Sequence, residues 1–165
     1  MNRKLGFGSM YALTLIASMS AHAAPNDACT LLTPAQVGAA LGTPVNDGEA
    51  LSPTHREYCS FNETGKAGGV GRNAHISIID EKKFTLGKTP IPRVEKMPES
   101  GLGDEAYWSK VRGMVYVLSV RKGSNYIRVQ SRTNKEALAK ANTPALDEQD
   151  RAADRKLALE ILKKL

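Results

Sequence analysis

The chain is short of the residues that build metal centres and covalent catalytic sites. Its 165 residues include only two cysteines and three histidines. Of the histidines, His55 and His75 lie beyond the N-terminal segment, and neither stands at metal-ligand spacing from another histidine, cysteine or carboxylate. Gly-x-Ser-x-Gly and Cys-x-x-Cys motifs are both absent. We therefore expect no metal and no cofactor, and no motif assigns a catalytic residue.

The N-terminus has the pattern of a secretory signal peptide. Arg3 and Lys4 form a positive start, residues 5–18 an apolar stretch, and residues 21–23 (Ala-His-Ala) a small-x-small cleavage site. The apolar stretch is shorter than the roughly 20 residues that a spanning helix needs. We expect cleavage after residue 23 and a periplasmic or secreted protein.

Cleavage would leave residues 24–165, which is the size of a single domain. Loss of Arg3 and Lys4 lowers the formal net charge from +6 to +4, too weak a positive field to indicate nucleic-acid binding. No second apolar run approaches spanning length, so no transmembrane segment is expected in the mature chain.

The two cysteines, Cys29 and Cys59, predict a disulfide. In an exported protein an even number of cysteines indicates pairing, and two allow only one intramolecular bridge. Closing the loop between Cys29 and Cys59 stabilises the fold by about 3–4 kcal/mol in the chain-entropy model.

Helical signals stand at both ends of the mature chain. Thr33-Pro34-Ala35-Gln36 is a capping box with proline at the first helical position, and Gly42 is a left-handed stop. Thr143-Pro144 opens a longer helix with an apolar stripe, acidic residues in its first turns and Lys163-Lys164 in its last.

Between these helices the pattern favours strands. Alternation with a period of two marks residues 58–61, 74–80, 105–109 and 125–132. Residues 114–121 are predicted to be a central strand, because nearly every position from 114 to 120 is apolar. Residues 82–100, rich in proline, glycine and charge, are predicted to be a surface excursion with little regular structure. We expect an α+β fold: a mostly antiparallel sheet of about five strands, with both helices packed on one face.

Three motifs of this chain resemble those of small exported bacterial proteins of unknown function. They are Cys29-Thr30-Leu31-Leu32-Thr33, a second cysteine beside aromatics (Tyr58-Cys59-Ser60-Phe61), and Gly101-Leu102-Gly103-Asp104-Glu105-Ala106 ahead of hairpin strands. The resemblance spans roughly residues 28–131. It implies a disulfide-stapled α+β domain, and some relatives look like ligand-binding modules of the envelope.

One face of the sheet is a candidate binding surface. If Ile127 and Val129 face the core, the residues that alternate with them on the strand at 125–132 point to the opposite face of the sheet. Tyr107 and Trp108 are adjacent on another strand, so one of the two also points to that opposite face. Arginines and aromatics on one face can hold an anionic or sugar-like ligand, although a solvated sheet face has the same pattern. The candidate ligand-binding residues are Tyr126, Arg128, Arg132, His75 and Trp108. We expect Arg128 and Arg132 to stand about 6.6–7 Å apart along the strand and to bind one anionic group or two neighbouring ones.

The function that this pattern favours is an exported, non-catalytic binding module of the envelope or the secreted fraction. Its partner would be an anionic or sugar-like small molecule or an envelope component. A hydrolase or transferase is the first alternative, with a site assembled in space from His55, His75 and one of Asp80, Asp104 or Glu105. An inhibitor-like protein that presents residues 82–100 as its binding loop is the second.

Overall fold

The computed structural model describes residues 26–66, 71–111, 116–133 and 143–165, so the predicted signal peptide at residues 1–23 lies outside the described residues. The helices are η1 (Ala28–Thr30), α1 (Pro34–Leu41), α2 (Glu81–Lys88) and α4 (Thr143–Leu162). The strands are β1 (Glu49–Ala50), β2 (Tyr58–Asn62), β3 (Asn73–Ile79), β4 (Val94–Glu99), β5 (Glu105–Val111), β6 (Tyr116–Lys122) and β7 (Asn125–Arg132).

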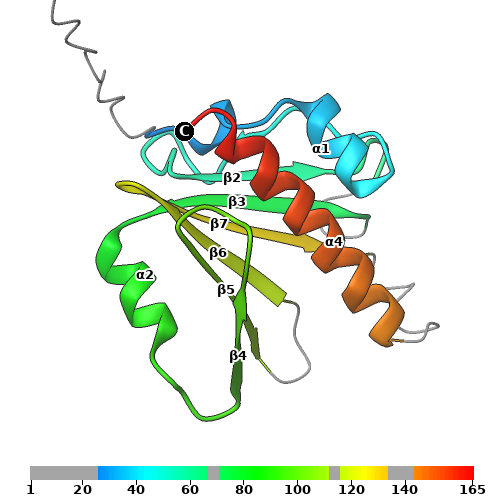
Figure 1. The fold of residues 1–165 in the computed structure, drawn as a ribbon. Helices are drawn as coiled ribbons and strands as arrows, with labels where there is room; N and C mark the ends of the chain where they lie inside the picture. The colour runs from blue at the N-terminus through cyan, green and yellow to red at the C-terminus, as the bar shows by residue number, and fades with distance from the viewer. Residues whose placement is uncertain (1–25, 67–70, 112–115, 134–142) are drawn as a thin grey trace, which may run out of the picture.

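The strands form one antiparallel sheet in the order β1-β2-β3-β7-β6-β5-β4 (Figure 1). An α+β fold with a mainly antiparallel sheet is therefore confirmed, but the expected number of about five strands is wrong, because the sheet has seven. The two strands that the sequence pattern missed, β1 and β4, are its edges. Strand β1 has only two residues, which are too few to show an alternating pattern. Strand β4 contains Pro98, a residue that argues against a strand in the sequence but is tolerated in an edge strand.

Helix α1 and the disulfide fix the N-terminal part against the sheet. Thr33 and Gln36 form the predicted capping box, and Gly42 ends α1 with a left-handed backbone (φ 73°). The predicted disulfide joins Cys29 and Cys59, with their Cα atoms 5.1 Å apart. Because Cys59 lies in β2, the bridge ties the entrance of α1 to the sheet.

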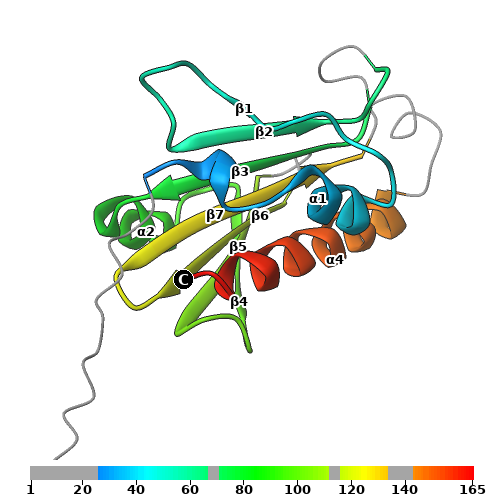
Figure 2. The same ribbon diagram turned by 90° about the horizontal axis from the view of Figure 1, so that it is seen from above.

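The main core lies between one face of the sheet and the helices α1 and α4 (Figure 2). Leu157 and Ile161 of α4 are fully buried against this face, where β6 and β7 contribute Leu118 and Val129. The amphipathic stripe read from the sequence is thus the face that α4 packs on the sheet. No helix in the described part of the chain is long and apolar enough to cross a membrane.

Helix α2 lies on the opposite face of the sheet, which corrects two expectations (Figure 2). Residues 82–100 are not an irregular excursion, since they hold most of α2 and all of β4, and the helices do not all pack on one face. The side chain of Asp80 accepts a hydrogen bond from the Lys83 backbone N–H and so caps α2. Only Phe84 of this short helix is buried, too little for a readable apolar stripe.

Candidate functional site

The register of the sheet aligns a row of side chains beneath α2. Arg128 on β7 lies opposite Ser77 of β3 and Ser119 of β6, and Ser119 in turn lies opposite Tyr107 of β5. Paired residues of neighbouring strands share a face, so these four side chains all stand on the side of the sheet away from α4. We call this side the α2 face.

Helix α2 is attached to the α2 face through both aromatic and polar contacts. The Phe84 ring lies 5.2 Å from the ring of Tyr107 and 5.4 Å from that of Tyr126, measured between centroids. The Tyr107 hydroxyl donates to the Phe84 carbonyl oxygen at 3.0 Å, and Nη2 of Arg128 donates to the Lys83 carbonyl oxygen at 3.2 Å. The helix backbone therefore holds both side chains in place.

Lys96 reaches the same cluster from the edge strand β4. It pairs with Ser109 of β5, and its Nζ donates to the Ser109 hydroxyl at 2.7 Å and lies 5.6 Å from the centre of the Tyr107 ring. Partial burial lowers the pKa of Lys96, and the positive charge of Arg128 lowers it further. Lys96, Tyr107 and Arg128 together form what we call the cationic cluster.

The two cations of this cluster have no acidic partner in the part of the chain that the structure describes. Within the described residues neither Lys96 nor Arg128 forms a salt bridge, although both are half-buried. Some other half-buried cations lie beside a carboxylate, such as Lys110 beside Asp147 and Arg72 beside Asp150. Lys122 and Arg151, in contrast, also form no salt bridge among the described residues. Partly desolvated positive charges without a counter-charge are costly, and a bound anion would offset that cost.

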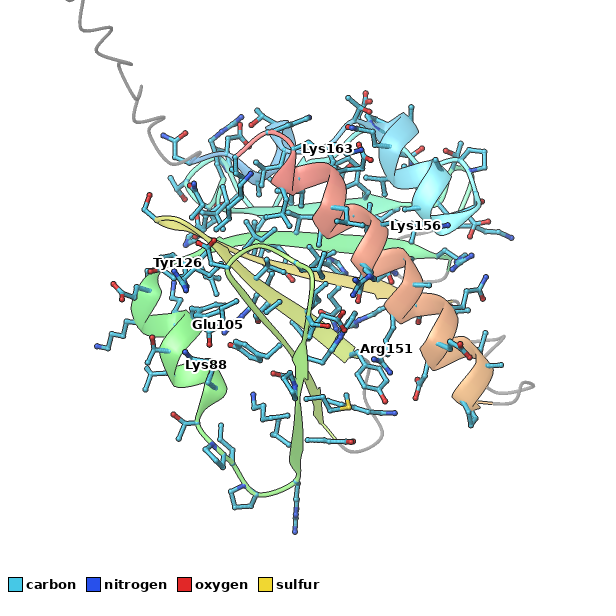
Figure 3. The ribbon with its side chains drawn as sticks, viewed as in Figure 1. Lys88, Glu105, Tyr126, Arg151, Lys156 and Lys163 are labelled. Carbon is cyan, nitrogen blue, oxygen red and sulfur yellow. A yellow bond between two sulfur atoms is a disulfide. The ribbon has the colours of Figure 1, made fainter. Side chains whose placement is uncertain are left out.

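A cavity of about 400 Å³ opens beside the cluster, between the end of α2 and the β4–β5 hairpin. Lys88 and Glu105 form an ion pair of 2.8 Å on its wall, and Figure 3 shows these two side chains side by side. A volume of this size suits a small molecule. The cavity is lined by Lys88, Lys96, Met97, Pro98, Glu99, Asp104, Glu105, Ala106 and Tyr107.

Four of the five predicted ligand-binding residues lie on the α2 face, because Tyr126, Arg132 and His75 have the same strand parity as Arg128. Trp108 does not. It is 1% exposed in the core beneath α4, lies opposite Leu118, and donates from Nε1 to Glu99 at 2.7 Å. Adjacent strand residues point to opposite faces, so Tyr107 takes the place that we expected Trp108 to occupy.

The expected pairing of Arg128 with Arg132 is also corrected. The two residues are four positions apart on β7, which separates them by about 13 Å along the strand, and Gln130 stands between them. They cannot grip one small anion together. Arg132 instead lies near His75. The pKa of His75 is lowered mainly by burial and to a smaller extent by the positive charge of Arg132. Tyr126 is at the opposite end of β7, under Phe84.

The two histidines lie apart from the cationic cluster and from each other. His75 has a buried Nδ1 without a hydrogen-bond partner among the described residues, and its ring stands 5.9 Å from that of Tyr58. The Nδ1 of His55 contacts the Ser52 hydroxyl at 2.9 Å in an exposed turn. Neither histidine contacts a carboxylate in the described ranges, and those ranges contain no group of three residues suited to a metal ion.

Lys96 is the site residue that sequence reasoning missed, because β4 itself was not predicted. Val94–Met97 (Val-Glu-Lys-Met) does not alternate between apolar and charged residues, and prolines 92 and 98 flank it, so no local signal indicated a strand there. Comparisons of the chain with protein-family models, curated proteins and solved structures found no match.

Proposed function

We propose that the protein is an exported, non-catalytic binding module that holds an anionic ligand between Lys96 and Arg128. The observation that carries the proposal is that two half-buried cations, neither with an acidic partner among the described residues, converge on Tyr107. Each already binds a neutral oxygen of the protein, so both are positioned before a ligand arrives. Such preorganisation reduces the entropy lost on binding.

The residue types favour a carboxylate or a phosphate over other anions. Arginine offers a planar fork of donors that matches either group, and lysine adds a mobile point charge. A small organic acid, a sugar acid or a phosphorylated sugar therefore fits the chemistry of Lys96 and Arg128. The adjoining cavity has room for a small molecule, but its lining shares only Lys96 and Tyr107 with the cluster and does not include Arg128.

Export is the second part of the proposal. The disulfide between Cys29 and Cys59 supports an oxidising compartment, because such bridges persist mainly in exported proteins. The signal-peptide pattern at residues 1–23 supports the same conclusion. The ligand would then be met in the periplasm or outside the cell.

Native mass spectrometry of the protein purified from the envelope of its host tests the proposal. The wild type should carry a small anionic adduct, and the double variant Lys96→Gln/Arg128→Gln should lose it. The variant Lys156→Gln is the matched control, since it removes a positive charge from the exposed side of α4 (Figure 3). An adduct that survives in the double variant would place the ligand elsewhere and refute the proposed site.

A further inference from the structure

The segment from Lys82 to Val94 combines positive charge with exposed apolar side chains. It contains Lys82, Lys83, Lys88 and Arg93 and no acidic residue. It also contains two of the four large hydrophobic residues that are exposed among the described residues, Leu86 (58% exposed) and Ile91 (52%). We call this segment the basic tip.

The helical part of the basic tip turns Lys82, Lys83 and Leu86 to the same outer side, whereas Lys88 reaches back to Glu105 of β5. Phe84 is the residue that α2 buries against the sheet. Leu86 is two positions further, about 200° around the helix, and therefore points away from the sheet. Lys82 and Lys83 precede Leu86 by four and three positions, so they are its neighbours on the outer surface of α2.

The remainder of the basic tip is a rigid turn that presents Ile91. Prolines 90 and 92 flank this residue, and the Val94 N–H donates to the Ile91 carbonyl oxygen at 3.1 Å. Arg93 has a left-handed backbone (φ 68°), which is unfavourable for a side chain other than glycine. Figure 1 places this turn at the end of the molecule opposite α1. The backbone therefore holds an apolar residue outward at a projecting end.

Two of the four cations of the basic tip form ion pairs, and two do not within the described ranges. Lys83 lies 3.6 Å from Asp80, with both side chains more than half exposed, and Lys88 pairs with Glu105. Exposed pairs of this kind are weak. Lys82 and Arg93 form no salt bridge within the described ranges, and the acids in the flanking sequence are Asp80, Glu81 and Glu95.

We infer that the basic tip docks on a membrane surface that contains anionic phospholipids, with Leu86 and Ile91 entering the headgroup region and the cations lying at the level of the phosphates. Peripheral proteins use this combination of apolar and basic side chains at bilayer surfaces. Two exposed apolar side chains are far fewer than the roughly 20–30 residues that each partner contributes to a standard protein interface. The inference rests on residues other than the cationic cluster.

Vesicle co-sedimentation tests this inference with phosphatidylcholine vesicles that contain, or lack, phosphatidylglycerol. The wild type should bind the anionic vesicles, and raising the salt concentration should weaken that binding. The double variant Leu86→Ser/Ile91→Ser should bind about tenfold or more weakly, since it removes the inserted side chains. Leu51→Ser is the matched control, because Leu51 is 69% exposed outside the basic tip and should change binding little.

A second variant separates charge from insertion. Lys82→Gln/Arg93→Gln should lose affinity for anionic vesicles while its thermal unfolding stays close to that of the wild type. Wild-type protein that does not sediment with anionic vesicles would overturn the inference. Equal binding by the wild type and Leu86→Ser/Ile91→Ser would also overturn it, as would equal binding to both vesicle compositions. Capture of a phosphate or organic acid by the cationic cluster is measured separately and does not depend on these outcomes.

Discussion

Gly87 of α2 packs directly on the Tyr107 side chain of β5. A Cβ at position 87 would overlap the Tyr107 hydroxyl and would stand 3.1 Å from Nη2 of Arg128. The absence of a side chain at this position allows α2 to approach the sheet closely enough for its carbonyl oxygens to bind Tyr107 and Arg128.

Gly87→Ala should therefore destabilise the protein although alanine is the better helix former. Helix propensity favours alanine by about 1 kcal/mol, whereas overpacking against a fixed hydroxyl costs about 1–3 kcal/mol. Urea unfolding of Gly87→Ala, Tyr107→Phe and the double variant measures the coupling. In the Tyr107→Phe background the alanine should cost less by at least about 0.5 kcal/mol. If the two substitutions change the free energy of unfolding by purely additive amounts, the contact between Gly87 and Tyr107 does not restrain α2.

The buried carboxyl of Asp154 gives stability a defined pH dependence. Asp154 is fully buried in α4, accepts from the Ser131 N–H through Oδ1, and has no partner for Oδ2 among the described residues. Burial raises the pKa of Asp154 well above the usual range, and the negative charge of the nearby Asp150 raises it further. Asp150 itself lies 3.8 Å from Arg72. The pKa of Asp154 in the folded state exceeds the unfolded value of about 3.9. Its contribution to the free energy of unfolding is therefore complete below pH ~3.9 and is lost as the pH rises through the folded-state pKa.

Asp154→Asn should thus raise the free energy of unfolding at neutral pH by about 1–3 kcal/mol, because the amide keeps an acceptor for Ser131 without a buried charge. Denaturant unfolding at a series of pH values measures the difference, which should shrink toward zero below about pH 4. A variant that is no more stable at neutral pH, or whose advantage persists unchanged in acid, would contradict this explanation.

The disulfide should account for a large share of the stability. Replacing Cys29 and Cys59 together by serine should lower the free energy of unfolding by about 3–4 kcal/mol, since the bridge closes a loop with a sequence separation of 30 residues. Chemical denaturation of the oxidised, reduced and double-serine proteins measures the effect. Unfolding midpoints that do not differ among the three, or two titratable thiols in the unreduced native protein, would contradict the assignment.

The sequence predicted the elements whose signals are local. The cap formed by Thr33 and Gln36, the stop at Gly42 and the alternation of Ile127 and Val129 each require only a few neighbouring residues. Helix α2 and strand β4 were missed because tertiary contacts stabilise them: one buried phenylalanine holds α2, and β4 is an edge strand containing a proline.

The candidate site was predicted only in part for the same reason. Strand parity placed Arg128 correctly, but it could not decide between Tyr107 and Trp108, which depends on how β5 pairs with β6. Lys96 joins the cluster only through the pairing of β4 with β5, a contact that no local pattern encodes.

The central claim is that Lys96 and Arg128 bind an anion together, and isothermal titration calorimetry at low ionic strength tests it most directly. Inorganic phosphate, citrate and glucuronate are titrated into the wild type, Lys96→Gln, Arg128→Gln and the control Lys156→Gln. At least one anion should bind the wild type and Lys156→Gln with similar affinity, and each of the other variants about ten- to hundredfold more weakly. If none of the three anions binds the wild type, or if they bind Arg128→Gln and Lys96→Gln as tightly as the wild type, the claim is wrong.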